Sequence, residues 1–175
     1  MILSLLDNWD RAFDEAVKAI KEKKVIAYPT DTLYMVGGNA LDKDVLKRAE
    51  EMTKARPSCI IIANLEMLLR YFELNEEETK YITRLCPGPY IFMLKPRAKM
   101  GIEDSRGNVG VMIPNHIFIR KVCFEADAPI SGYPGKEGAD VTIESGAKPA
   151  GKEPTVVNIR EKRVERQGAG EFSFE

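Results

Sequence analysis

The sequence predicts an α+β fold in which one twisted, open, mixed sheet is flanked by helices. Three observations predict it. The 175 residues fit one hydrophobic core, because a domain usually contains about 100 to 200 residues. Amphipathic helical segments alternate with short apolar segments along the chain. Two apolar segments, 90–95 and 109–114, follow each other without a helix between them, which favours an antiparallel pair. We therefore expect residues 1–175 to form a single domain.

Apolar residues at helical spacing predict five helices. These cover residues 10–23, 43–52, 65–72, 76–85 and 116–126. Asp42, Asn64 and Asn75 each precede one of these segments and are good N-caps, and Glu78 would complete a capping box with Asn75. Runs rich in β-branched and aromatic residues predict strands at 25–29, 58–64, 90–95, 109–114, 154–159 and 164–168, the last of which closes the sheet. By composition, the glycine-rich and charged stretch 131–151 is the least structured part, where an active-site loop or irregular connection would lie.

Composition and charge indicate a folded protein that binds anions only locally. The 44% hydrophobic and 30% charged residues are typical of globular domains, not of disordered chains. Lysine and arginine total 26 against 27 acidic residues, so no overall positive field draws the chain to nucleic acid or an anionic membrane. No apolar run approaches the roughly 20 residues of a membrane helix, and the N-terminus lacks the basic segment of a secretory signal. We expect a cytoplasmic protein without a membrane partner.

The cysteines and the one histidine form no recognisable metal or nucleotide motif. Cys59, Cys86 and Cys123 are widely spaced within apolar runs, which favours buried, reduced thiols. His116 lies between a strand segment and a helical one, so a helix-capping or surface histidine is favoured over a general base. There is no zinc ligand set, no P-loop and no Rossmann glycine motif. We expect no metal held by the side chains of the chain.

The first of three polar clusters follows the strand segment 25–29. Thr30, Asp31, Thr32 and Tyr34 would lie at the rim of the sheet, where open α/β sheets bind ligands. The alternative is a threonine turn whose hydroxyls cap their own backbone.

The other two polar clusters contain arginine. Lys54 and Arg56 follow a helix and precede a strand, so they either converge on an anion or complement the helix dipole. Arg166, Gln167 and Gly168 follow the last strand, where the glycine would let a ligand approach the backbone. A solvated terminal strand is the alternative there.

Taken together, these segments resemble the threonylcarbamoyladenylate synthase (YrdC-like) family. The resemblance rests on AYPTDTLY with a following glycine pair, then KARP, CPGPY, VGVMIPNH, API with SGYPG, PTVVNI and RQG, in this order. It covers residues 27–168, and the absence of a long extension after them resembles the short, single-domain form of the family. The implied fold is YrdC/RibB-like, a twisted mixed sheet around a concave basic groove.

The resemblance implies an enzyme that joins ATP, bicarbonate and L-threonine into threonylcarbamoyladenylate and pyrophosphate, with Mg²⁺ accompanying ATP. A separate transferase complex would use this intermediate to modify adenosine 37 of tRNA. Lys54 and Arg56 match the motif that contacts the ATP phosphates, and they would be catalytic through charge neutralisation. Arg166 matches a second nucleotide contact. The positions matching the threonine site are Thr32, with Thr30 and Tyr34 on the same wall.

Several positions depart from the family pattern. Met112 stands where the family has an arginine that would hold the threonine carboxylate, Met35 replaces a glycine, and Ile91 replaces a threonine. Pro154 replaces a serine, the Ser-x-Asn motif expected after Ile130 is absent, and the polar segment after KARP is missing. A methionine cannot pair with a carboxylate, so threonine affinity would fall by about 1.5 to 3 kcal/mol, the contribution of a charged hydrogen bond.

Two other functions are compatible with the sequence. A non-catalytic module could bind tRNA or double-stranded RNA through the same groove, with Lys54, Arg56 and Arg166 contacting phosphates. A degenerate relative would bind nucleotide without releasing pyrophosphate. Salt dependence separates RNA binding from an ATP site, since binding through many phosphates weakens steeply with salt.

Overall fold

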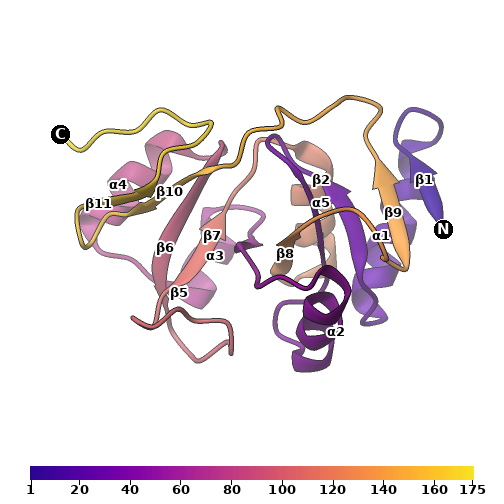
Figure 1. The fold of residues 1–175 in the computed structure, drawn as a ribbon, viewed down its shortest axis with the longest axis horizontal. Coiled ribbons are helices and arrows are strands. Elements are labelled where there is room, and N and C mark those ends of the chain that lie inside the picture. Colours follow the sequence, from indigo (N-terminus) through magenta and orange to yellow (C-terminus); the bar gives the residue numbers. More distant parts are fainter.

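One mixed sheet forms the framework of the molecule (Figure 1). The structure is a computed structural model that describes all of residues 1–175. Its eleven strands run in the order β1-β9-β2-β3-β8-β4-β7-β6-β10-β11, and β5 pairs with β6. The strands are β1 (Ile2–Ser4), β2 (Ile26–Pro29), β3 (Tyr34–Gly37), β4 (Cys59–Ile61), β5 (Phe72–Glu73), β6 (Tyr90–Pro96), β7 (Val109–Met112), β8 (Ile130–Pro134), β9 (Val141–Glu144), β10 (Thr155–Asn158) and β11 (Arg163–Arg166). Because β4 and β7 are parallel and β6 and β7 antiparallel, the expected mixed sheet and antiparallel pair are confirmed.

Five helices lie at the predicted positions. They are α1 (Trp9–Lys21), α2 (Lys43–Thr53), α3 (Leu65–Tyr71), α4 (Glu76–Leu85) and α5 (Ile117–Ala126). Asp42 and Asn64 accept hydrogen bonds from the first-turn backbone of α2 and α3, and Asn75 and Glu78 form the complete capping box of α4. His116 occupies the N-cap position of α5 but makes no capping hydrogen bond, so it does not cap the helix. None of the five helices has both the length and the apolar character needed to cross a membrane.

The two faces of β2 belong to two different apolar clusters. Ile26 and Tyr28 are part of the main core of 36 buried residues, which also contains the buried side of α1. Ala27 and Val36 belong to a second cluster of seven, together with the buried side of α2. Successive side chains of a strand point to opposite faces, so α1 and α2 cover opposite sides of this part of the sheet. Burial on both faces explains why the strand is a continuous apolar run rather than an alternating one.

The stretch 131–151 contains β8 and β9, which tie most of its length up to Glu144 into the sheet, so the expectation that it is the least structured part is wrong. The irregular connection expected there is present, because no helix or strand lies between Glu144 and Thr155. Its glycines pack the backbone closely: a Cβ atom on Gly132 would lie 2.7 Å from Met35 Sδ. Glycine therefore lets β8 run between β3 and β4. The strands expected from the sequence do not include β3, the short run Tyr34–Gly37 that ends at the glycine pair, and a Cβ on Gly37 would lie 1.8 Å from the Ser131 carbonyl oxygen. β9 completes the sheet between β1 and β2, with alternate side chains buried.

Candidate active site

The Thr30 hydroxyl holds the turn between β2 and β3. Its oxygen accepts hydrogen bonds from the backbone N–H groups of Thr32 (3.1 Å) and Leu33 (3.0 Å), and it donates to the Leu33 carbonyl oxygen at 2.7 Å. The Thr32 hydroxyl lies 3.1 Å away, and both threonine side chains are buried. The turn thus caps itself, as the alternative interpretation of this cluster predicts. The three bonds to backbone use the donor and both acceptor positions of the Thr30 hydroxyl, whereas the Thr32 hydroxyl has no hydrogen-bond contact other than its 3.1 Å approach to Thr30.

Tyr34 connects the same hairpin to the end of β9. Its phenolic oxygen accepts a hydrogen bond from the Ser145 backbone N–H at 3.1 Å and lies 3.3 Å from Ser145 Oγ. The Lys136 ammonium lies 4.6 Å from the centroid of the Tyr34 ring and pairs with Glu144 at 2.8 Å. Protein groups therefore fix Tyr34 next to the threonine turn, and a contact from it to substrate stays a prediction.

The threonine turn and Arg166 both form hydrogen bonds to the connection between β9 and β10. The N–H groups of residues 150–151 donate to the carbonyl oxygens of Asp31 (3.3 Å) and Thr32 (2.9 Å). Further along, the Pro154 carbonyl oxygen accepts hydrogen bonds from Arg166 Nε (3.3 Å) and Nη2 (3.0 Å), and Nη1 forms an ion pair within the connection. Two predicted site residues that are far apart in the sequence are thereby tied to the same stretch of backbone.

Gly168 packs against backbone rather than opening it to a ligand. Its N–H donates to Thr155 Oγ1 at 2.9 Å, and a Cβ atom there would lie 2.1 Å from the Glu153 carbonyl oxygen. Gln167 next to it donates to the Gly170 carbonyl oxygen at 2.7 Å. The expectation that this glycine serves ligand approach is wrong, because the group that approaches it is the β9–β10 connection.

Lys54 and Arg56 lie in the short link between α2 and β4. Lys54 is the C-cap of α2, with a left-handed φ of 52°, and its N–H donates to the Glu50 carbonyl oxygen. Both side chains are exposed, and neither forms an ion pair. Arg56 lines a pocket and Lys54 does not, so the structure brings only the arginine to a cavity.

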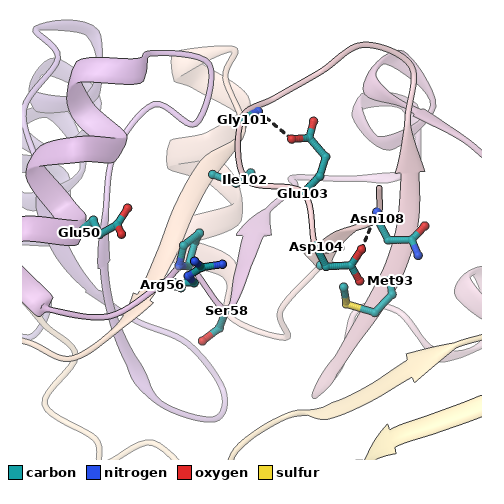
Figure 2. Close-up of a pocket in the computed structure, with 11 residues that line it drawn as sticks. Glu50, Arg56, Ser58, Met93, Gly101, Ile102, Glu103, Asp104 and Asn108 are labelled. Atoms are coloured by element: carbon teal, nitrogen blue, oxygen red, sulfur yellow. Dashed lines mark hydrogen bonds between the residues drawn. The ribbon is translucent and has the colours of Figure 1, made fainter. Parts of the chain in front are cut away.

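The Arg56 pocket opens between α2, the start of β4 and the β6–β7 loop (Figure 2). It has a volume of about 350 Å³. Its lining residues are Glu50, Arg56, Pro57, Ser58, Met93, Gly101, Ile102, Glu103, Asp104, Asn108 and Gly110. Arg56 is the one cation among them, together with three carboxylates. A lining of this kind suits a metal-bound phosphate group better than a bare anion.

Backbone N–H groups of the β6–β7 loop hold the two acidic side chains of that loop in place. Glu103 accepts hydrogen bonds from the N–H groups of Met100 and Gly101, and Asp104 accepts two from the loop that follows it. Burial raises the pKa of Glu103, but these N–H groups outweigh it and hold that pKa below its usual range. The sequence points only to Arg56 in this pocket, because the loop, GIEDSRGN, carries no motif beyond turn-forming residues.

Two departures from the family pattern lie on the face of the sheet that lines the Arg56 pocket. Met93 and Gly110 are partners across β6 and β7, and both line the pocket. Side chains two residues apart share a face, so Ile91 and Met112 continue that face on the two strands. Met112 is also the partner of Ile61 on β4. Met112 is therefore flanked by an isoleucine on each side.

A third departure, Met35, borders the same surface. Its Sδ lies 4.0 Å from Cys59 Sγ, and Cys59 is two residues before Ile61 on β4. We call the apolar floor the set Met35, Cys59, Ile61, Ile91 and Met112. All five are at most 2% exposed. The floor contains no charged group that could pair with a carboxylate.

Two buried polar atoms, Asp31 Oδ1 and His116 Nδ1, have no hydrogen-bond partner. Burial raises the pKa of Asp31, against the opposing effect of the N–H groups of Asn115 and of Asp31 itself. Burial lowers the pKa of His116, so this histidine is neutral at pH 7. It does not line the Arg56 pocket, and the geometry gives it no general-base role there.

The three cysteines are free thiols, as expected. Cys59 and Cys123 are buried, and Cys86 is half-buried. Burial raises the pKa of each to about 12, so all three are protonated at neutral pH. A protonated thiol is a poor nucleophile and metal ligand, so no cysteine is poised for covalent catalysis.

Comparison with known proteins gives one consistent result. The model of the Sua5/YciO/YrdC family, described as "Telomere recombination", matches residues 18–132. A threonylcarbamoyl-AMP synthase of Pyrococcus abyssi is 32% identical over 170 residues, which cover 81% of this chain and 49% of that protein. One from Vibrio vulnificus is 28% identical over 126 residues, 67% of each chain. The chain thus spans about half the length of the Pyrococcus relative.

Solved structures agree with the sequence comparisons. Pyrococcus abyssi Sua5 complexed with L-threonine has a TM-score of 0.80 and 26% identity, over 91% of this chain and 54% of that one. Escherichia coli YciO has a TM-score of 0.82 over 92% of this chain and 91% of that one. At 21% identity, YciO supports the fold alone.

Proposed function

Because the chain belongs to the Sua5/YciO/YrdC family, as the sequence predicts, we propose that it is a threonylcarbamoyl-AMP synthase. The observation that carries the proposal is the similarity to proteins of that name, together with the family match over residues 18–132, which include the threonine turn and Arg56. The structure of Sua5 with L-threonine supports an amino-acid substrate. The product would pass to a separate transferase complex that modifies adenosine 37 of tRNA.

The proposed reaction has two steps. The amine nitrogen of L-threonine attacks the carbon of bicarbonate, and loss of water leaves a carbamate. A carbamate oxygen then attacks the α-phosphorus of ATP, the bond to the β-phosphate breaks, and pyrophosphate leaves. Both steps concentrate negative charge, so positioning and charge neutralisation suffice and no protein nucleophile is required. The protonated cysteines and the neutral His116 are compatible with this chemistry.

Some residues of the site would bind the phosphates of ATP, and others would bind L-threonine. Arg56 would bind a phosphate through its guanidinium fork, and Lys54 would add a point charge from the neighbouring surface. Arg166 would contact the nucleotide after exchanging its hydrogen bonds to the β9–β10 connection. The Thr32 hydroxyl would contact threonine, with Thr30 setting the shape of the turn.

Magnesium would enter as part of the MgATP substrate. The chain has no group of three or more carboxylate, imidazole or thiol side chains arranged to hold an ion. The ATP phosphates would therefore supply most of the ligands, as is common for Mg²⁺ in nucleotide sites.

The apolar floor favours a second candidate function. With Met112 in place of the family arginine, the threonine carboxylate loses its expected partner. The chain would then be a relative that binds MgATP without completing the transfer to L-threonine.

Pyrophosphate release from MgATP tests the proposal. Release by the purified chain should require both L-threonine and bicarbonate, and L-serine should support it less well. Arg56→Gln should lower the rate at least about tenfold, the effect of one lost charge-assisted hydrogen bond to phosphate. Arg11→Gln, an exposed position on α1, is the matched control and should have no effect. No release in the presence of bound MgATP would favour the second candidate.

A further inference from the structure

We propose that a second pocket, next to the Arg56 pocket, binds a phosphate-type anion. The basic pocket, as we call it, has a volume of about 270 Å³ and no hydrophobic lining residue. Its lining residues are Lys95, Arg106, Gly107, Asn108, Asn158, Arg160 and Glu161. Only Asn158, in PTVVNI, belongs to a segment of the family pattern, and no role at the proposed synthase site is assigned to any of the seven, so the inference goes beyond the proposed function.

Four parts of the chain meet at the basic pocket. Lys95 comes from the end of β6, residues 106–108 from the β6–β7 loop, Asn158 from the end of β10, and residues 160–161 from the β10–β11 turn. Asn108 lines both pockets, so they adjoin. The sheet itself fixes their relative position, because β6 pairs with both β7 and β10.

The charge of the basic pocket favours an anion. Three lining side chains are positive and one is negative, which leaves a net charge of +2. Lys95 is exposed and forms no ion pair. Arg106 pairs with Glu161 and, at 3.9 Å, with Glu165, in both cases through Nη1. Arg160 uses Nη2 for its protein partners, Glu78 at 2.9 Å and the Glu73 carbonyl oxygen at 3.5 Å. The remaining N–H groups of both guanidinium groups have no protein partner, so they can donate to a ligand.

The hydrogen-bonding groups of the basic pocket are mainly donors. The Asn158 Oδ1 already accepts a hydrogen bond from the Glu161 N–H at 3.0 Å, which leaves its amide N–H₂ as the free group. The Asn108 side chain has no protein partner and can turn its amide toward a ligand. Phosphate oxygens accept several hydrogen bonds at once, and arginine forks match their geometry. The volume lies below the roughly 300 to 1,000 Å³ of drug-sized ligand sites, so a small hydrated anion such as phosphate or pyrophosphate fits.

Isothermal titration with inorganic phosphate, and separately with pyrophosphate, tests this site. Both titrations use protein carrying Arg56→Gln, which removes anion binding at the adjoining pocket. We expect saturable binding that Lys95→Gln weakens about tenfold, the effect of one charge-assisted hydrogen bond. Lys95 has no ion pair to lose, so the variant should fold normally. Lys99→Gln, an exposed lysine of the β6–β7 connection outside the pocket, is the matched control and should change affinity less than twofold.

The two anions distinguish the sources of the phosphate group. Tighter binding of pyrophosphate would indicate a diphosphate ligand, and equal binding would indicate a single phosphate group; both results support the site. In amide NMR spectra, Gly107 and Asn108 should shift on titration. Equal weakening by Lys95→Gln and Lys99→Gln would overturn the proposal, because it would mean non-specific attraction. Absence of saturation at millimolar phosphate and pyrophosphate would overturn it as well. Neither result depends on whether the chain releases pyrophosphate from ATP.

Discussion

Replacing Met112 by arginine would insert a guanidinium into the apolar floor between Ile61 and Ile91. Met112 is fully buried, and both flanking positions are aliphatic, so the new charge has no partner. An uncompensated buried charge costs about 3 to 5 kcal/mol, out of roughly 5 to 15 kcal/mol of total stability for a domain. For a chain of this length each kcal/mol lowers the Tm by about 2 to 4 °C. We therefore expect Met112→Arg to lower the Tm by roughly 10 °C in the absence of ligand.

Thermal unfolding followed by circular dichroism, with and without L-threonine, measures both parts of this prediction. L-Threonine should raise the Tm of Met112→Arg more than that of the wild type, because its carboxylate supplies the missing partner and binding stabilises the native state. L-Threoninol, which lacks the carboxylate, is the matched ligand control and should not do so. Met112→Leu is the size control, with an expected cost below about 1.5 kcal/mol. If the ligand-free Met112→Arg variant is as stable as the wild type, the apolar floor does not bury the new charge, and the reasoning is refuted.

Three further predictions concern buried ionisable groups. The thiol pKa values of about 12 lie above the unfolded value, so their contribution to stability is complete below about pH 9 and is lost as the pH rises toward 12. In urea unfolding above pH 9, Cys123→Ala should therefore reduce the pH slope of the unfolding free energy by about 1.4 kcal/mol per pH unit, and an unchanged slope contradicts this. Because burial raises the pKa of Asp31, Asp31→Asn should raise the Tm at pH 7 and lose that advantage below about pH 4, where the wild-type group is protonated as well. A lower Tm at pH 7 would show that the charge is satisfied. Glu78→Gln breaks the ion pair of a buried carboxylate with Arg160 and should cost about 1 to 3 kcal/mol in urea unfolding. Glu77→Gln breaks the more exposed ion pair with Lys162 and should cost below about 1 kcal/mol. Equal unfolding costs for Glu77→Gln and Glu78→Gln would contradict an effect of burial.

Helices and their caps were predictable because their determinants are local. Asn75 and Glu78 are three residues apart, and their reciprocal hydrogen bonds need no other part of the chain. The antiparallel β6–β7 pair was predictable for a similar reason, since the two apolar runs follow each other without a helix between them. In contrast, β8 pairs with β4 and β9 pairs with β2, which are strands from a distant part of the sequence. The sequence around Gly132 does not show whether this glycine lies in a loop or, as the structure shows, in a tightly packed strand.

The same difference between local and distant determinants applies to the site residues. The self-capped turn of Thr30 could be predicted from three adjacent residues, and the structure shows its hydrogen bonds. The link between this turn and Arg166 could not, because it runs through a glycine-rich connection without a motif of its own. The sequence did not predict that Glu103 and Asp104 line the Arg56 pocket, because backbone hydrogen bonds within a loop place these two side chains.

Each of three departures from the family pattern, considered alone, would be interpreted as the loss of one functional side chain or glycine: Met35, Ile91 and Met112. Strand register changes that interpretation, because Met112 pairs with Ile61 and shares its face with Ile91, while Met35 contacts Cys59 on the neighbouring strand. An arginine at position 112 needs a polar neighbour or a ligand, and a threonine at position 91 would supply one such neighbour. With isoleucine there, methionine is the stable partner, since an apolar side chain of similar length fills the row without burying a charge. The three substitutions therefore form one coupled change of the floor, and reverting one of them alone measures mainly the cost of burying a polar group beside the other two.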